Sequence, residues 1–92
     1  MKKEVIRYEL KVDPIQTIQL PYDAKVLDIT LIGKTPTLWA LVNLAYKDRL
    51  FDRTFVMVEK EVPERIHGAD CYVGMIEFKA EVGSKFIHEF EQ

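Results

Sequence analysis

Apolar and polar side chains alternate with a period of two along most of the chain, which is the pattern of β-strands rather than of helices. Proline, glycine and aspartate turn signals interrupt the alternation every eight to twelve residues on average. The strands are expected at residues 4–10, 15–20, 24–32, 37–44, 53–60, 71–82 and 85–91. Six to seven short strands spaced in this way predict an all-β domain, a small antiparallel β-sandwich or barrel.

Residues 37–44 are the most apolar of these stretches and contain the only tryptophan, Trp39. Both sides of a strand over these residues would be apolar, so the prediction places it at the centre of the fold with both faces covered. A buried helix is the alternative interpretation. Pro36 before the stretch and the β-branched Thr37 and Val42 favour the strand.

Turn residues predict how some of these strands are joined. Asp13-Pro14 is expected to turn the first strand into a hairpin with the second, and Gly33 is expected at a positive φ between the third and fourth. Gly83-Ser84 is predicted to be the two-residue turn of the last hairpin. The one long connection, residues 59–70, is expected to be a loop with a short helical turn near residues 63–67.

Length and composition limit what the protein can be. Ninety-two residues make one domain, residues 1–92, and 48% hydrophobic against 30% charged residues indicates a folded one. The single cysteine, Cys71, is expected to be a small core residue of a protein in a reducing compartment. No apolar run approaches membrane-spanning length, so we expect a cytoplasmic protein without membrane contact. The net charge of −2 makes duplex DNA an improbable partner but leaves room for a small anion held locally.

Residues with catalytic spacing are not found in the sequence. It has no glycine-rich phosphate loop, no metal-spaced set of His and Cys, and no His placed beside a nucleophile. The prediction is a protein that is not an enzyme and uses no cofactor or metal. His67 and His88 are expected at the surface or the rim of the sheet.

Two groups of side chains could bind a ligand. The aromatic residues offer flat faces on which a nucleobase can stack, and core packing is the alternative. The arginines and a lysine beside a threonine could bind phosphate, and ordinary ion pairs are the alternative. The candidate site residues are Arg7, Tyr8, Lys34, Thr35, Trp39 and Arg53. The wider aromatic and cationic sets also include Tyr46, Tyr72, Phe86, Phe90 and Arg49.

Several motifs together resemble a family of short phage proteins. The chain opens with Tyr8-Glu9-Leu10, has Pro36-Thr37-Leu38-Trp39-Ala40-Leu41-Val42 at its centre, and closes with Tyr72-Val73-Gly74 and His88-Glu89-Phe90-Glu91. The corresponding family patterns are Y-x-L, P-x-L-W-A-L-V, Y-x-G-T and W-H-V-F-E. This chain departs from them at Met75, at Lys85-Phe86, and in residues 59–63, where relatives tend to have a Gly- and His-containing loop.

The resemblance implies a small phage protein that antagonises host defence, similar to the anti-CBASS sponges, which sequester cyclic nucleotide signals. The partner would then be a cyclic dinucleotide or a related nucleotide, bound without turnover in the cytoplasm of the infected host cell. A homo-oligomer is also expected, because the apolar surface of residues 38–44 and 55–58 exceeds what one small core needs. The alternatives are an antagonist that binds a host protein and a minor structural or accessory protein of the phage.

Overall fold

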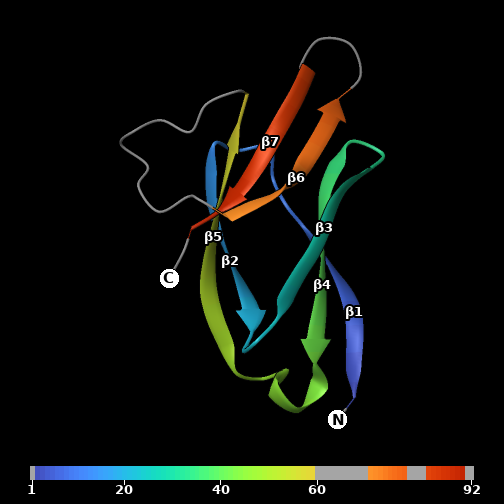
Figure 1. Ribbon diagram of the computed structural model, residues 1–92, viewed down its shortest axis with the longest axis vertical. Helices are drawn as coiled ribbons and strands as arrows, with labels where there is room; N and C mark the ends of the chain where they lie inside the picture. Colours follow the sequence, from blue (N-terminus) through green and yellow to red (C-terminus); the bar gives the residue numbers. More distant parts are fainter. Residues whose placement is uncertain (1, 60–70, 79–82, 91–92) are drawn as a thin grey trace.

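A computed structural model describes residues 2–59, 71–78 and 83–90, which form seven strands in two antiparallel sheets (Figure 1). The three-stranded sheet has the order β1 (Lys3–Glu9), β4 (Thr35–Asn43), β3 (Lys25–Ile32). The four-stranded sheet has the order β2 (Ile15–Pro21), β5 (Leu50–Val58), β7 (Gly83–Glu89), β6 (Cys71–Phe78). The prediction of an all-β fold is confirmed, and β4 is the central strand of its sheet.

One core lies between the two sheets. Alternate residues of each strand point into it, as the period of two predicts. The largest fully buried apolar side chains come from five strands: Leu20, Leu38, Phe55, Ile76 and Ile87. We call the side of each sheet that faces this core the inner face and the other side the outer face.

The two sheets approach each other most closely where β3 meets β6. A Cβ atom added to Gly74 of β6 would lie 2.6 Å from Cγ2 of Ile29 of β3, so glycine is required for this contact. Each of these strands also carries a bulge, between Val26 and Asp28 in β3 and between Tyr72 and Gly74 in β6. The bulges bend the two strands close to the contact.

The β3–β4 turn follows the prediction, because Gly33 has a φ of 62°. Two other turn predictions are wrong. β1 does not form a hairpin with β2, since β1 pairs with β4 and β2 pairs with β5 in the other sheet. Gly83 and Ser84 are not the turn of the last hairpin, because both belong to β7 and pair with Phe78 and Glu77.

The segment after β4 contains a 3₁₀ helix, Leu44–Tyr46, because the Asn43 side chain ends the strand by accepting a hydrogen bond of 3.0 Å from the Ala45 amide. Cys71 is exposed at the start of β6 rather than buried in the core. The helical turn expected near residues 63–67 and the side chain of His67 lie outside the described residues.

Candidate binding surfaces

The six predicted site residues do not gather in one place. Strand pairing puts Arg7 and Trp39 opposite each other on the outer face of the three-stranded sheet, with Thr35 on the same face of β4. Lys34 lies in the turn that leads into Thr35. Tyr8 points to the inner face of that sheet, and Arg53 belongs to the other sheet. The structure therefore pairs Arg7 with Trp39, places Thr35 on the same face about 13 Å farther along β4 with Lys34 in the adjoining turn, and separates Tyr8 and Arg53 from them.

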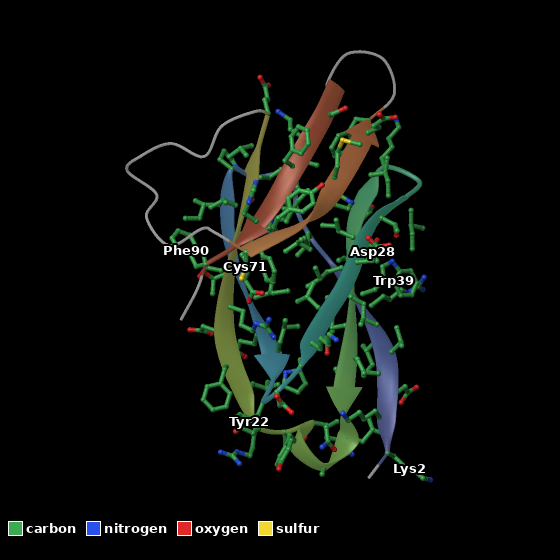
Figure 2. The ribbon with its side chains drawn as sticks, in the orientation of Figure 1. Lys2, Tyr22, Asp28, Trp39, Cys71 and Phe90 are labelled. Atoms are coloured by element: carbon green, nitrogen blue, oxygen red, sulfur yellow. The ribbon has the colours of Figure 1, made fainter. Side chains whose placement is uncertain are left out.

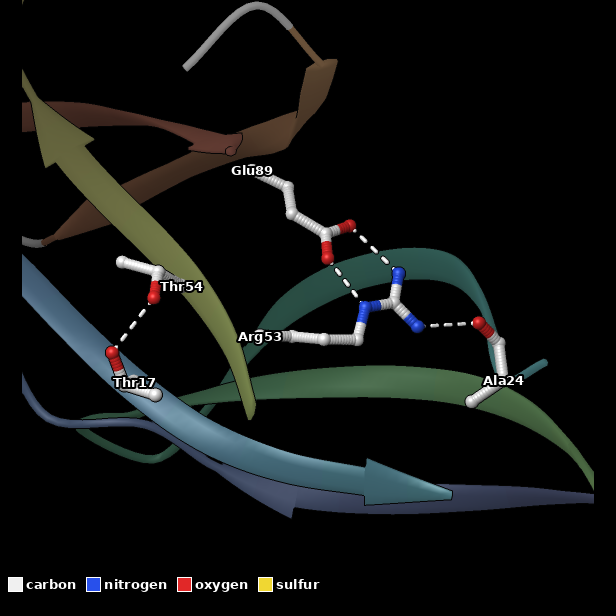
Figure 3. Close-up of polar contacts among 5 residues, drawn as sticks. All are labelled: Thr17, Ala24, Arg53, Thr54 and Glu89. Atoms are coloured by element: carbon white, nitrogen blue, oxygen red, sulfur yellow. Dashed lines mark hydrogen bonds and ion pairs between the residues drawn. The ribbon is translucent and has the colours of Figure 1, made fainter. Parts of the chain in front are cut away.

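Arg53 has a structural role that accounts for its guanidinium group. Its Nε and Nη2 donate to the two carboxylate oxygens of Glu89 on β7, at 2.5 and 2.8 Å (Figure 3). Its Nη1 donates to the Ala24 carbonyl at 2.5 Å, just before β3. The Arg53 and Glu89 side chains are only 21% and 12% exposed. These hydrogen bonds of the guanidinium fork link the four-stranded sheet to the start of β3. For Arg53, the ordinary ion pair is therefore the interpretation that applies.

A cleft of about 550 Å³ lies beside this ion pair. Residues 23–27 form one wall, residues 71–73 form the other, and Arg53 and Glu89 complete the lining. The walls belong to β3 and β6, near the bulges of both strands. The cleft is lined by side chains of both charges: the acidic Asp23 and Glu89, and the basic Lys25 and Arg53. Because the charges balance, the cleft does not select for an anion.

Tyr8 belongs to the packed interior rather than to a ligand surface. It lies opposite Leu38, which is fully buried, and packs against the core cluster. Partial burial raises the pKa of the Tyr8 phenol above its ordinary value of 10.0, because the charged phenolate loses hydration there. The core-packing alternative for the aromatic residues therefore applies to Tyr8.

Trp39 does not belong to the core, because it lies half-buried on the outer face of its sheet. Its indole Nε1 donates a hydrogen bond of 2.7 Å to Oγ1 of Thr30 on β3, which fixes the ring across the neighbouring strand. Figure 2 shows Trp39 beside Asp28, on the side of the strands away from the four-stranded sheet. We call the outer face of the three-stranded sheet around this ring the Trp39 face.

The Trp39 face is more basic than the chain as a whole. Register places Arg7 and Asp28 on either side of Trp39. The strand positions of this face carry three basic and two acidic residues: Lys3, Arg7, Lys25, Glu9 and Asp28. Arg7 is exposed and makes no ion pair with a carboxylate of the described residues. Arg7 is therefore an exposed arginine whose cross-strand neighbour on this face is Trp39.

A second aromatic cluster, which the candidate list did not include, lies at one end of the molecule. The Tyr22 ring lies 4.9 Å from the Tyr46 ring and 5.8 Å from the Phe51 ring. The guanidinium carbon of Arg49 lies 4.8 Å from the centre of the Tyr22 ring and 5.6 Å from that of Tyr46. Figure 2 shows Tyr22 at the end of the molecule where β2 stops. We call these four residues the aromatic end.

Tyr46 and Arg49 were in the wider aromatic and cationic sets, but Tyr22 and Phe51 were in neither. Tyr22 and Phe51 are about half-exposed, at 44% and 47%. The four residues come from three separate segments, which are joined by the Tyr22 amide donating to the Arg49 carbonyl at 2.7 Å. The only local sign of this cluster in the sequence is that Tyr22 lies in a Pro-Tyr-Asp turn. In the structure, Asp23 of that turn has a positive φ of 62°.

The described residues contain no group of three or more His, Cys, Asp or Glu side chains placed to hold a metal ion. None of the helical segments in the same residues combines the length and apolar character needed to cross a membrane.

Comparisons with known proteins give one match. No curated protein and no solved structure matches the chain. A family model described as a domain of unknown function, DUF7352, matches residues 1–92. Since the match covers the whole of the given sequence, the chain belongs to the DUF7352 family.

Proposed function

We propose that the protein binds a cyclic dinucleotide or a related nucleotide on the Trp39 face and sequesters it without chemical change. A nucleobase stacks against the ring of Trp39, and the Arg7 guanidinium binds a phosphate. Lys34 and Thr35, at the β3–β4 end of the same face, supply further donors. Retention of an immune signal in this way would antagonise host defence, which is the role that the phage-family resemblance implies.

The observation that carries this proposal is the position of Arg7. Arg7 lies directly opposite Trp39 in the pairing of β1 with β4, and none of the described carboxylates pairs with it. Arg53 shows the contrast, because its fork is occupied by Glu89 and the Ala24 carbonyl. An aromatic ring beside an unpaired guanidinium provides both stacking and phosphate binding.

The contributions of base stacking and of phosphate binding to the binding free energy should be large enough to measure. Stacking of one base on an aromatic side chain contributes about 1–3 kcal/mol. A hydrogen bond to a charged group contributes about 1.5–3 kcal/mol. Loss of either partner should therefore weaken binding by roughly 10-fold to 100-fold, with the lower value expected for an exposed face.

Calorimetry against a panel of cyclic di- and trinucleotides tests the proposal. We expect one or more of these ligands to bind, with weaker binding by Trp39→Ala and by Arg7→Ala. Arg49→Ala is the matched control, because it removes another exposed arginine, one that lies beside tyrosines instead of Trp39. Ligand recovered after denaturation should be chemically unchanged.

Three results would contradict this proposal in different ways. If no nucleotide in the panel binds, nucleotide sequestration is excluded as the function. Loss of binding in Arg49→Ala but not in Arg7→Ala would move the site to the aromatic end. Degraded nucleotide on recovery would identify an enzyme instead of a sequestering protein.

Docking on a host protein is a second candidate function, and the aromatic end favours it. The Tyr22 and Phe51 rings are exposed, and Arg49 lies over the rings of Tyr22 and Tyr46. Tyr and Arg are enriched among the residues that dominate protein interfaces. A protein captured from host lysate by the wild type and by Arg7→Ala, but not by Tyr22→Ala or Arg49→Ala, would support this function. Capture that is unaffected by the two aromatic-end variants would exclude the aromatic end as the docking site.

A further inference from the structure

The cleft between residues 23–27 and 71–73 lies where the edge strands of the two sheets come together. β3 and β6 lie side by side (Figure 1), but no register joins their described residues, since β3 pairs with β4 and β6 pairs with β7. The two strands touch at Ile29 and Gly74, and the cleft opens beyond this contact. Its volume of about 550 Å³ is typical of small-ligand sites, which have about 300–1,000 Å³.

The backbone of both walls is suited to an extended ligand. β3 and β6 each have one edge outside the hydrogen-bond ladders of the described residues. Unpaired N–H and C=O groups on a strand edge can pair with the backbone of an extended peptide. The bulges leave further backbone groups out of the ladders near the cleft. The shorter wall, residues 71–73, has the length of roughly three residues of extended chain.

Side chains of the inner face also line the cleft. Cys71 of β6 pairs with Glu89 of β7, and Glu89 pairs with Phe55 of β5. Cross-strand partners lie on the same face, and Phe55 is buried in the core, so Cys71 and Glu89 are directed to the space between the sheets. Cys71 is nevertheless exposed, at the start of β6 (Figure 2). Its thiol can therefore report whether the cleft is occupied.

The charged groups of the cleft retain capacity for a ligand. The Arg53 guanidinium has five N–H donors, of which the described residues use three, for Glu89 and the Ala24 carbonyl. Asp23 and Lys25 are both exposed, and neither makes an ion pair with the described residues. The cleft can therefore bind a carboxylate through Arg53 or Lys25 and an ammonium group through Asp23.

Apolar side chains lie among these charges, from Val26, Leu27 and Val73. Leu27 is 45% exposed, so a ligand that covers it removes apolar surface from water. A ligand with one charge of each sign and an apolar body matches this lining. A short apolar peptide with free termini has these properties.

We propose that the cleft binds a short peptide of about three residues in an extended conformation, with both termini free. Its carboxylate accepts hydrogen bonds from the remaining N–H groups of Arg53 and lies near Lys25, while its ammonium group binds Asp23. Its backbone pairs with the edges of β3 and β6, and its side chains pack on the apolar lining. Peptide binding here is independent of nucleotide binding, because the Trp39 ring is not part of the cleft.

Protection of Cys71 from alkylation tests this site in the full chain. Cys71 is the only cysteine, so mass spectrometry of the intact protein follows its reaction with iodoacetamide directly. The probe is the tripeptide alanyl-leucyl-alanine with free termini. At saturating probe the alkylation rate should fall by at least about 10-fold, because an occupied cleft shields the thiol. The same tripeptide with acetylated and amidated ends should not protect at equal concentration, and neither should free leucine.

Two variants test the charged groups of the cleft. Asp23→Asn and Lys25→Gln should each raise the probe concentration for half-protection by about 10-fold, since each removes a charged partner. Asparagine tolerates the positive φ of 62° at residue 23, and Lys25 is exposed, so both variants should keep the fold. Asp13→Asn and Lys3→Gln are the matched controls, because both residues are exposed and neither lines the cleft. Arg53 is left intact because its ion pair links the two sheets.

Four results would overturn the proposal. The first is an alkylation rate that the free tripeptide does not change at millimolar concentration. Equal protection by the blocked tripeptide would show that the charged termini have no role. Equal protection by leucine would assign the cleft to a free amino acid instead of a peptide. Protection that both Asp23→Asn and Lys25→Gln leave unchanged would place the probe outside the cleft.

Discussion

Arg53 and Arg7 are both arginines on β-strands, yet their surroundings differ. Arg53 lies on the inner face of β5, where a carboxylate and a carbonyl oxygen use its donors. Arg7 lies on the outer face of β1, where a tryptophan is its cross-strand neighbour and no described carboxylate pairs with it. The burial of Arg53 requires a partner, because an unpaired charge in this position would lose hydration without compensation.

This difference separates structural cations from those that remain available to a ligand. The Arg53 group connects residues of β5 and β7 with the start of β3, so its loss should affect folding. The Arg7 guanidinium makes no ion pair with the described carboxylates, so its loss should affect ligand binding and not folding.

Removal of the Glu89 carboxylate should destabilise the protein most. Glu89→Ala leaves the Arg53 guanidinium mostly buried without its bidentate partner. Breaking a buried ion pair costs about 3–5 kcal/mol, and partial solvent access at the cleft should reduce this to about 2–4 kcal/mol. Urea unfolding measures the change, with Glu89→Gln as a control that retains hydrogen-bonding atoms and should lose less. A change below that of an ordinary surface substitution would show that the fork does not stabilise the fold.

Addition of one methyl group where the sheets touch should have the next largest effect. Gly74→Ala places a carbon 2.6 Å from Cγ2 of the buried Ile29, so one of the strands must move. Overpacking of this kind costs about 1–3 kcal/mol. The double variant Gly74→Ala with Ile29→Leu removes Cγ2 from residue 29, because leucine has a single γ carbon, and it tests the cause directly at nearly constant side-chain volume. If the double variant is no more stable than expected from the two separate changes, the clash is not the origin of the loss.

The alternation along each strand predicted which of its side chains share a face, but not which strands pair. The alternation in residues 4–10 correctly assigned Arg7 and Tyr8 to opposite faces, because side-chain direction in a strand is a local property. The hairpin expected for β1 and β2 was wrong, since strand pairing depends on the packing of the whole chain. Gly83 was misplaced for a related reason, because the ladder between β6 and β7 continues to it.

The candidate site was less predictable than the fold. Arg53 and Glu89 are 36 residues apart, so no local pattern could show that they form an ion pair. The aromatic end unites the turn after β2 with the segment from the 3₁₀ helix to β5, and Tyr22 and Phe51 look unremarkable within their own segments. Trp39 could be assigned to the centre of a strand, but its position on the outer face depends on which side of the sheet the core occupies.

Loss of the Arg7 side chain should have little effect on stability, in contrast to loss of Glu89. Arg7→Ala removes an exposed side chain without an ion pair among the described residues, and such changes usually alter stability by less than about 0.5 kcal/mol. The same variant should weaken nucleotide binding, as proposed above. Urea unfolding and calorimetry on one preparation measure both effects. A large loss of stability in Arg7→Ala would show that Arg7 is structural as well, and the distinction between the two arginines would fail.

The ion pair between Lys85 and Glu59 should have the smallest effect, although it is geometrically good. Lys85 Nζ lies 2.9 Å from Glu59 Oε1, but the Glu59 side chain is 76% exposed. The hydrogen bond and the charge of Lys85 lower the pKa of Glu59 below its ordinary value of 4.5. A carboxyl group whose pKa is lowered in the folded state stabilises the protein above its ordinary pKa, and this stabilisation is lost as the pH falls through the lowered value.

Thermal unfolding of the wild type and of Glu59→Gln tests this last prediction. The wild type should be slightly more stable at neutral pH, and the difference should disappear well below pH 4.5 and in high salt, which screens exposed charges. Lys11→Gln is a suitable control, because Lys11 is exposed and makes no ion pair with the described residues. A difference that persists in acid would show that Glu59 contributes through packing and not through its charge. A Glu59→Gln effect as large as that of Glu89→Ala would show that burial does not distinguish structural ion pairs from the others in this protein.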